Sequence, residues 1–227
     1  MDRTEMHKEF KLLMDKTGGG SAPSFISAEI DRFLNIAQDK FVTKRAFGNN
    51  TRRTSFEEDQ KRKDDLRTLV KNNVNKTLVV SANTKPNGFL FELPTDYRHS
   101  INEEAVISTI DVSGSSRRVS VKPITHDKYN KIIDDPFNKP SKDTVYRLYY
   151  GGNNNSSFTE LITSSGQKVE EYHLRYLVTP TEISSDNNCT LASHTHREIV
   201  RMAVVDALET VEQPRYQSSK IELNEIE

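Results

Sequence analysis

The spacing of apolar residues changes twice along this chain of 227 residues, and that change limits the fold more than any single motif does. Between residues 27 and 46 apolar side chains recur with helical spacing, which predicts an amphipathic helix. From residue 77 they alternate with polar residues, as in strands, and from residue 195 the helical spacing returns. We therefore expect an α+β fold: a helical core with an inserted antiparallel β-sheet and a projecting β-hairpin.

Three long helices are expected in that core, near residues 27–46, 55–74 and 195–212. The apolar stripe of the first consists of Ile30, Phe33, Leu34, Ala37 and Phe41. The second is mostly charged, and its residues that need burial are Leu66, Leu69 and Val70. The third begins with a capping-box spacing at Thr195 and Glu198. Its apolar stripe consists of Ile199, Met202, Ala203 and Ala207.

Short β-branched and aromatic runs, separated by turn sequences, make residues 77–180 the β-rich part. The first four runs are TLVVS, GFLFELP, EEAVISTIDV and RRVSVKPI, and a short helix in THDKYNKII follows them. We expect TVYRLYY, SSFTELITS and KVEEYHLRYLVTP to form a meander of three strands around a projecting GGNNN loop. The last strand is expected to place Tyr172, Leu174, Tyr176 and Val178 on one face.

The chain is expected to divide into three parts. Residues 1–23 give a short amphipathic helix and the flexible break TGGGSAPS, which together predict an N-terminal arm. Residues 24–213 form a single domain, and residues 214–227 form a polar tail because Pro214 ends the last helix.

Composition limits the class of protein. Apolar residues make up 34% of the chain, below the roughly 45–50% of ordinary globular domains, and 29% of residues are charged. Part of the chain is therefore expected either to be disordered or to complete its burial against copies of itself and other proteins. Lys and Arg total 32 and Asp and Glu total 33, which argues against a tight DNA binder or a membrane-surface protein.

The single cysteine excludes an internal disulfide and a cysteine-built zinc site, as expected for a protein made in a reducing cytoplasm. The segment MDRTEMHKEFKLLM lacks the apolar core of a signal peptide, and no run elsewhere has the length of a membrane span. We expect a soluble protein.

Cys189, His194 and His196 lie within eight positions of one another and raise the possibility of a metal site. Because the two histidines fall at the entry of a helix, where positions two apart diverge, we interpret them as capping or surface residues. His126 beside Asp127 and the turn LPTDYRHS mix titratable types in the same way, but neither accompanies a nucleophile motif. No cofactor is predicted, and the chain is not expected to be an enzyme.

The sequence PRYQ follows the last helix directly. Its Arg215 and Tyr216 belong to residue types that are enriched at binding hot spots. A disordered end is the alternative interpretation of this tail.

Several stretches together resemble one family. They are FISAEIDRFLNIAQDKFV, FLFELPTDYRHSI, PITHDKYNKIIDDPFNKPSKDTVYRL, YHLRYLVTP and REIVRMAVVDALETVEQPRYQS. In this order they resemble the head-to-tail connector proteins of crAss-like phages, from about residue 25 to about residue 219. More distantly, the chain is similar to adaptor or tail tubular proteins of other short-tailed phages.

This resemblance implies a structural protein of the virion neck, made in the host bacterial cytoplasm. Identical subunits would form a ring, usually of twelve, under the portal protein and next to other neck or tail rings. The packaged DNA would pass through the lumen with transient, non-specific contacts, which suits the near-neutral net charge.

By the same resemblance, the C-terminal segment is expected to dock on the portal or on a neighbouring subunit. This role falls on Arg215, Tyr216, Gln217 and Ile221. Projecting hairpins can wedge between neighbours, so a contact between subunits is expected at the loop of Gly151, Gly152, Asn153 and Asn154.

Two other functions stay open from the sequence. A nucleic-acid-binding accessory protein would use the basic cluster between residues 52 and 63, which contains Arg52, Arg53, Lys61, Arg62 and Lys63. A hydrolase would use His126 or His194 and would require a pocket around it.

Overall fold

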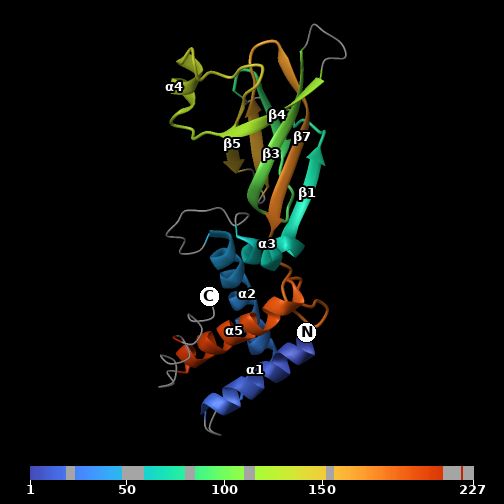
Figure 1. Ribbon diagram of the computed structural model, residues 1–227, viewed down its shortest axis with the longest axis vertical. Helices are drawn as coiled ribbons and strands as arrows, with labels where there is room; N and C mark the ends of the chain where they lie inside the picture. Colours follow the sequence, from blue (N-terminus) through green and yellow to red (C-terminus); the bar gives the residue numbers. More distant parts are fainter. Residues whose placement is uncertain are drawn as a thin grey trace. The chain divides into compact units, whose positions relative to one another are not determined.

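A computed structural model describes residues 1–18, 24–47, 59–79, 85–109, 116–151, 156–211 and 221. The chain divides into two compact units. The first, called the helical unit, consists of Met1–Leu69 and Pro180–Glu227, and the second, called the sheet unit, consists of Val70–Thr179. The sheet unit contains every strand of the seven-stranded sheet (Figure 1).

Four α-helices form the described part of the helical unit: α1 (Arg3–Gly18), α2 (Ser27–Phe47), α3 (Gln60–Leu66) and α5 (His196–Thr210). Helix α5 packs against both α1 and α2 (Figure 1). Among the described residues, no helix combines the length and the apolar character that a membrane crossing requires.

The core of the helical unit consists of the apolar stripes of these helices. The stripe predicted for residues 27–46 is confirmed, because Ile30, Leu34, Ala37 and Phe41 are fully buried. Phe33 of the same stripe stacks on Phe10 of α1, with 6.3 Å between the ring centroids. In α5 the predicted stripe is confirmed as well: Ile199, Met202, Ala203 and Ala207 are buried. Helical spacing therefore identified the buried faces correctly.

The sheet has the order β1-β7-β3-β4-β5-β6-β2. Its strands are β1 (Val70–Asn75), β2 (Gly88–Glu92), β3 (Tyr97–Thr109), β4 (Ser116–Pro123), β5 (Val145–Gly151), β6 (Ser157–Ile162) and β7 (Gln167–Val178). All neighbouring pairs are antiparallel except β4 and β5, which are parallel. The short helix α4 (Tyr129–Asp134) lies in the connection from β4 to β5.

The sheet curls so that its two ends approach each other. Phe91 of β2 and Tyr172 of β7 belong to strands that are not neighbours, yet their ring centroids are 5.8 Å apart. At the edge, the side-chain amide of Asn75 in β1 donates to the carbonyl of Glu92 in β2 over 2.9 Å. Apolar side chains inside the curl are thereby removed from water, and the sheet unit has a core of its own. Its fully or nearly buried members include Phe91, Ala105, Val145, Leu148, Leu161, Val169, Tyr172 and Leu174.

The prediction of a helical core with three long helices is wrong. The chain is mixed α+β, with a seven-stranded sheet that forms a compact unit and mostly short helices. The helix expected over 55–74 is described only as the seven residues of α3, after which a 3-10 turn leads into β1. The physical reason lies in the sequence VKNNVN, since asparagine and β-branched valine are weak helix formers and this segment finds a pairing strand in β7.

The predicted meander is correct for its first two strands, because β5 and β6 pair antiparallel, and wrong for the third. Strand β6 lies between β5 and β2, whereas β7 lies between β1 and β3. Strands β3 and β7 are the longest of the sheet, with 13 and 12 residues, and they pair along almost their whole length. Long-range pairing of two long strands satisfies more backbone groups than a local hairpin would, and single-strand patterns do not reveal it.

Candidate functional site

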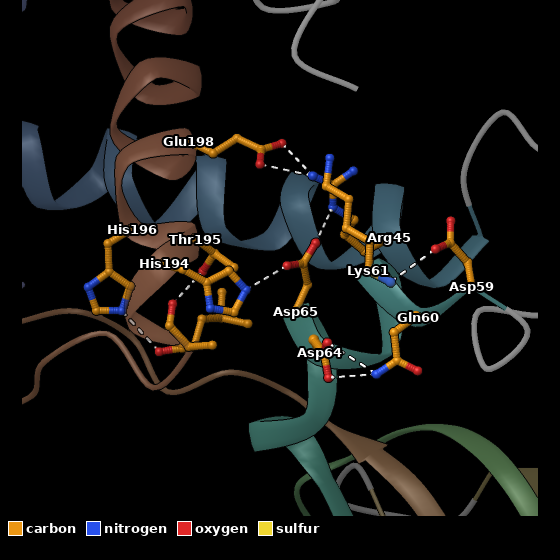
Figure 2. A network of polar contacts seen from close by, with 12 residues as sticks. Arg45, Asp59, Gln60, Lys61, Asp64, Asp65, His194, Thr195, His196 and Glu198 are labelled. Carbon is orange, nitrogen blue, oxygen red and sulfur yellow. Dashed lines mark hydrogen bonds and ion pairs between the residues drawn. The ribbon is translucent and has the colours of Figure 1, made fainter.

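Arg45, near the C-terminal end of α2, lies at the centre of a polar network that joins three helices (Figure 2). Its Nε lies 2.9 Å from Oδ2 of Asp65 on α3. Its Nη2 donates to both carboxylate oxygens of Glu198 on α5, over 2.8 and 2.9 Å. The side chains of Arg45 and Asp65 are only 6% and 4% exposed, so these charges depend on each other for the interactions that water would otherwise supply.

The second oxygen of Asp65 binds His194, which precedes α5. Nε2 of His194 lies 2.8 Å from Oδ1 of Asp65, and the imidazole is 53% exposed (Figure 2). Asp65 therefore lies between a buried guanidinium and a histidine at the surface. With contacts to Arg45 on α2 and to His194 in the turn before α5, the Asp65 carboxylate joins these elements to α3.

Helix α3 has seven residues and depends on such contacts, because isolated helices of this length are unstable in water. Asp59 caps its first turn by accepting a hydrogen bond from the backbone N–H of Lys61 over 3.0 Å (Figure 2). Lys61, Arg62 and Lys63, which belong to the cluster considered as a nucleic-acid-binding site, lie on this helix. Nε of Arg62 lies 3.8 Å from Oδ2 of Asp59. Arg52 and Arg53 lie outside the described residues.

The capping box predicted from Thr195 and Glu198 is wrong. A 3-10 turn, Ser193–Thr195, leads into α5, so Thr195 already has helical backbone angles and its side chain makes no cap. The Thr195 hydroxyl instead donates to the carbonyl of Ala192 over 2.8 Å. Glu198 reaches Arg45 rather than its own helix start, because the backbone N–H of Thr195 already donates to the carbonyl of Ala192 over 2.9 Å and a guanidinium offers a charge-assisted hydrogen bond.

The three residues of the cysteine and histidine cluster contact different groups. The thiol of Cys189 donates to Oε1 of Gln38 over 3.1 Å, and burial raises its pKa. His196 lies with Nδ1 3.0 Å from the carbonyl of Met1 and Nε2 2.9 Å from that of Leu191. Among the described residues, no group of three or more His, Cys, Asp or Glu side chains is arranged to bind a metal ion.

The other titratable stretches have structural partners too. His126 lies with Nε2 2.9 Å from the carbonyl of Tyr149. In the turn LPTDYRHS, Asp96 binds the ammonium of Lys71 over 2.8 Å and the hydroxyl of Tyr176 over 2.9 Å. Burial acts to raise the pKa of Asp96, but these two hydrogen bonds outweigh it and the pKa is lowered. The turn therefore connects β1, β3 and β7 at one end of the sheet.

A second buried ion pair lies inside the sheet unit. Nη1 of Arg147 on β5 lies 2.5 Å from Oε1 of Glu103 on β3, and the side chains are 11% and 6% exposed. The Tyr149 hydroxyl donates to the same oxygen over 3.1 Å, and the Arg147 guanidinium lies 3.9 Å from the Tyr149 ring centroid. Burial raises the pKa of Glu103, although Arg147 opposes the shift.

Most residues predicted to contact the portal or a neighbour fall outside the described part of the chain: Arg215, Tyr216, Gln217, Gly152, Asn153 and Asn154. Ile221 is described and its side chain is 61% exposed. Gly151 is the last residue of β5, and a Cβ added there would have open space around it. Their roles stay predictions.

Sequence reasoning missed two features of the molecule. The Arg45 network joins residues far apart in the chain, and no spacing of residues in the sequence predicts it. Phe137 is 95% exposed, the highest value among the exposed large apolar side chains of the described residues. The stretch DDPFNKP could have indicated this exposure, because its aromatic residue lies between two prolines and shortly after two acidic residues.

In the helical unit and in the sheet unit, the buried ion pairs described above join secondary-structure elements to one another. The family model described as phage tail ring protein 3/4 matches residues 1–218. The chain belongs to this family. The predicted resemblance to proteins of crAss-like phages is thereby confirmed.

Two relatives of this ring protein come from Bacteroides phage crAss001. Its ring protein 4/5 is 25% identical over 225 residues, which cover 90% of this chain and 91% of the relative. Its ring protein 3 is 27% identical over 225 residues, covering 90% of this chain and 94% of the relative. The family thus identifies a structural ring protein of a phage tail, and the alignment spans nearly the full length of both relatives.

Proposed function

We propose that this protein forms a ring in the neck of the virion, joins the portal to the tail, and lets the genome pass through the lumen of the ring. The observation that supports this most directly is the family match over residues 1–218, together with relatives that are named ring proteins 3 and 4/5. Neighbouring rings of related sequence would stack on it, and twelve copies are the expected number.

The charge balance supports a passage for DNA. With 32 basic and 33 acidic side chains the subunit has a net charge of −1. A strongly basic lumen would bind phosphates by releasing counterions and would slow transit. A near-neutral subunit lets DNA slide with weak contacts. The affinity of the assembled ring for duplex DNA is therefore expected to be low at physiological salt and to change little with salt concentration.

The ring requires each copy to present two unlike surfaces, because a cyclic assembly repeats one heterologous contact. The exposed large apolar side chains of the described residues can be buried in such contacts. They are Leu12, Ile26, Ile36, Phe47, Val74, Leu78, Phe137, Tyr149 and Ile221. They occur in both units, as expected if a subunit contacts more than one neighbour.

The tail at residues 214–227 is proposed to dock on the portal through Arg215, Tyr216 and Gln217, with Ile221 as an apolar contact. The loop at residues 151–154 is proposed to lie between subunits. Deleting residues 214–227 tests the first role: sedimentation with portal rings should show loss of binding. Undiminished portal binding by the shortened protein would remove this role. Replacing residues 152–154 by a short Gly-Ser loop tests the role of that loop between subunits in the same assay.

A further inference from the structure

Helix α1 binds the rest of the helical unit through one of its faces. Met6, Phe10 and Met14 recur every four residues along this face, and all three side chains are completely or almost completely buried. Other sides of the helix, with Lys11 and Asp15, are exposed. The partners of the buried face are α5 and α2 (Figure 1).

Polar contacts fix the position of α1 on this surface. Nε and Nη2 of Arg3 donate to Oδ1 and Oδ2 of Asp31 on α2, over 2.9 and 2.7 Å. Nε2 of His7 lies 2.7 Å from Oδ1 of the same carboxylate. The backbone N–H of Arg3 donates to the side-chain oxygen of Asn188 over 2.9 Å. Because a bidentate pair between guanidinium and carboxylate is directional, these contacts allow α1 only one register.

The side chains that α1 uses are of the types found between proteins. Phe, Met and Arg are enriched in protein–protein interfaces relative to the rest of the surface. The chain has only four methionines, and two of them, Met6 and Met14, lie on the buried face of α1 beside Phe10. The buried face of α5 consists mainly of Ile, Val, Leu and Ala instead, as is usual inside a domain. The contact of α1 thus resembles an interface more than a domain core.

Nothing in these contacts requires α1 to belong to the chain that it binds. The sequence between α1 and α2 includes GGGSAPS, at residues 18–24, and linkers rich in Gly and Ser allow the chain to leave in many directions. A second copy within reach can therefore present the same helix to the same surface. Exchange of an identical element between copies keeps every contact, which makes it a low-cost way to join subunits.

A ring requires two unlike surfaces that fit each other, repeated from copy to copy. Helix α1 and the surface of α2 and α5 that it covers are such a pair, and their fit is visible within one chain. We infer that in the ring α1 of each copy binds the helical unit of the next copy, in the place where α1 of a single copy binds its own chain. The inference rests on the proposed function, because the ring brings identical copies side by side, and it adds the element that links them.

The test crosslinks α1 to α5 between copies. Oε1 of Glu9 on α1 lies 3.7 Å from Nε of Arg197 on α5, and both residues reach the surface. Glu9→Cys and Arg197→Cys are made as separate variants on a Cys189→Ser background, which removes the only native thiol. The two variants are produced together in the same cells, assembled with portal rings and treated with a short bismaleimide. Roughly half of the Glu9→Cys chains should become linked to an Arg197→Cys chain, the share expected when two kinds of subunit mix at random round a ring.

Two controls accompany this mixture. Lys11→Cys replaces Glu9→Cys in the first, because Lys11 is exposed two positions further along α1 and so points in another direction. This mixture should give little crosslinking between chains. The second control is a single chain with both Glu9→Cys and Arg197→Cys, studied as a monomer. It should become crosslinked within the chain, as read by peptide mass spectrometry.

The outcomes separate the two claims. Rings whose Glu9→Cys and Arg197→Cys chains are linked well above the Lys11→Cys control support the inference. Rings without such links, although the monomer with both cysteines is crosslinked within its chain, overturn the inference and leave the ring function standing. A doubly substituted monomer that gives no internal crosslink also overturns the inference, since α1 would then not lie on α5. Failure of the unmodified protein to form any ring, alone or with portal, overturns the proposed function as well.

Discussion

Arg45 and Asp65 form an ion pair, with 2.9 Å between Nε and Oδ2, in a part of the helical unit where both side chains are almost completely buried. Charges in such a position are stable only together, because burying each one costs desolvation free energy that the attraction of its partners offsets. Glu198 and His194 complete the set from the last helix and its preceding turn. The pair therefore determines how α2, α3 and α5 stay together.

Arg45→Met is expected to lower the free energy of unfolding by about 3–5 kcal/mol, because it leaves the carboxylate of Asp65 buried without its guanidinium. Urea unfolding followed by circular dichroism measures the change. Lys40→Ala is the matched control on the same helix, since Lys40 is 54% exposed and pairs with Asp206 at the surface. That loss should be about 0–1 kcal/mol. Equal effects of the two variants would contradict the role of the buried network.

Gly88→Ala is expected to destabilise the sheet unit. A Cβ at residue 88 would lie 2.8 Å from the carbonyl of Lys85 and would collide with the carboxylate of Glu160, which accepts a hydrogen bond from the N–H of Lys85. We expect a loss of about 2 kcal/mol, as for other overpacked sites. Gly151→Ala has open space around its Cβ and should be neutral. Thermal unfolding of both variants checks the difference. If Gly88→Ala were as stable as the unmodified protein, the side chain of Glu160 would have to lie elsewhere.

Phe91→Ala tests the curl of the sheet. Phe91 is 1% exposed and contacts Tyr172 across the curl, so the cavity left behind should lower stability by about 3–5 kcal/mol. Phe137→Ala removes the same side chain from a position that is 95% exposed and should leave unfolding unchanged. Calorimetry on the two variants gives the comparison. A mild effect at Phe91 would show that β2 does not close against β7.

Asp31→Asn should change how stability depends on pH. Burial acts to raise the pKa of Asp31, but hydrogen bonds from Arg3 and His7 outweigh it and hold the pKa below its ordinary value of 3.8. A lowered folded-state pKa means that the stabilisation is fully present above the unfolded-state value and is lost as pH falls through the folded-state value.

The unmodified protein should therefore exceed Asp31→Asn in stability by about 1 kcal/mol at neutral pH, a modest figure because the carboxylate is partly exposed. The difference should shrink as the pH falls below 3.8. Unfolding curves at several pH values measure it. A difference that grows toward acid would have the wrong sign for this account.

Local patterns in the sequence predicted the features that depend on neighbours along the chain. The apolar stripes of α2 and α5 and the buried face of β7, with Tyr172, Leu174, Tyr176 and Val178, all lie where the spacing indicated. The family resemblance was also visible in the ordered stretches.

Features that depend on distant residues were not predictable in this way. The segment after Leu66 has charged and apolar residues that fit a solvated helix, but pairing with β7 over residues 172–177 favours the strand instead. Likewise β7 pairs with β3 rather than with the adjacent β6. Asp65 and Glu198 gave no local sign that a single arginine, Arg45, would join them.

The most direct test of the central claim is electron microscopy of the purified full-length chain, imaged alone and after addition of portal rings. We predict closed rings with rotational symmetry, expected to be twelvefold, stacked under the portal, with a central opening free of protein. A protein that stays monomeric in both samples and does not associate with the portal would contradict the account.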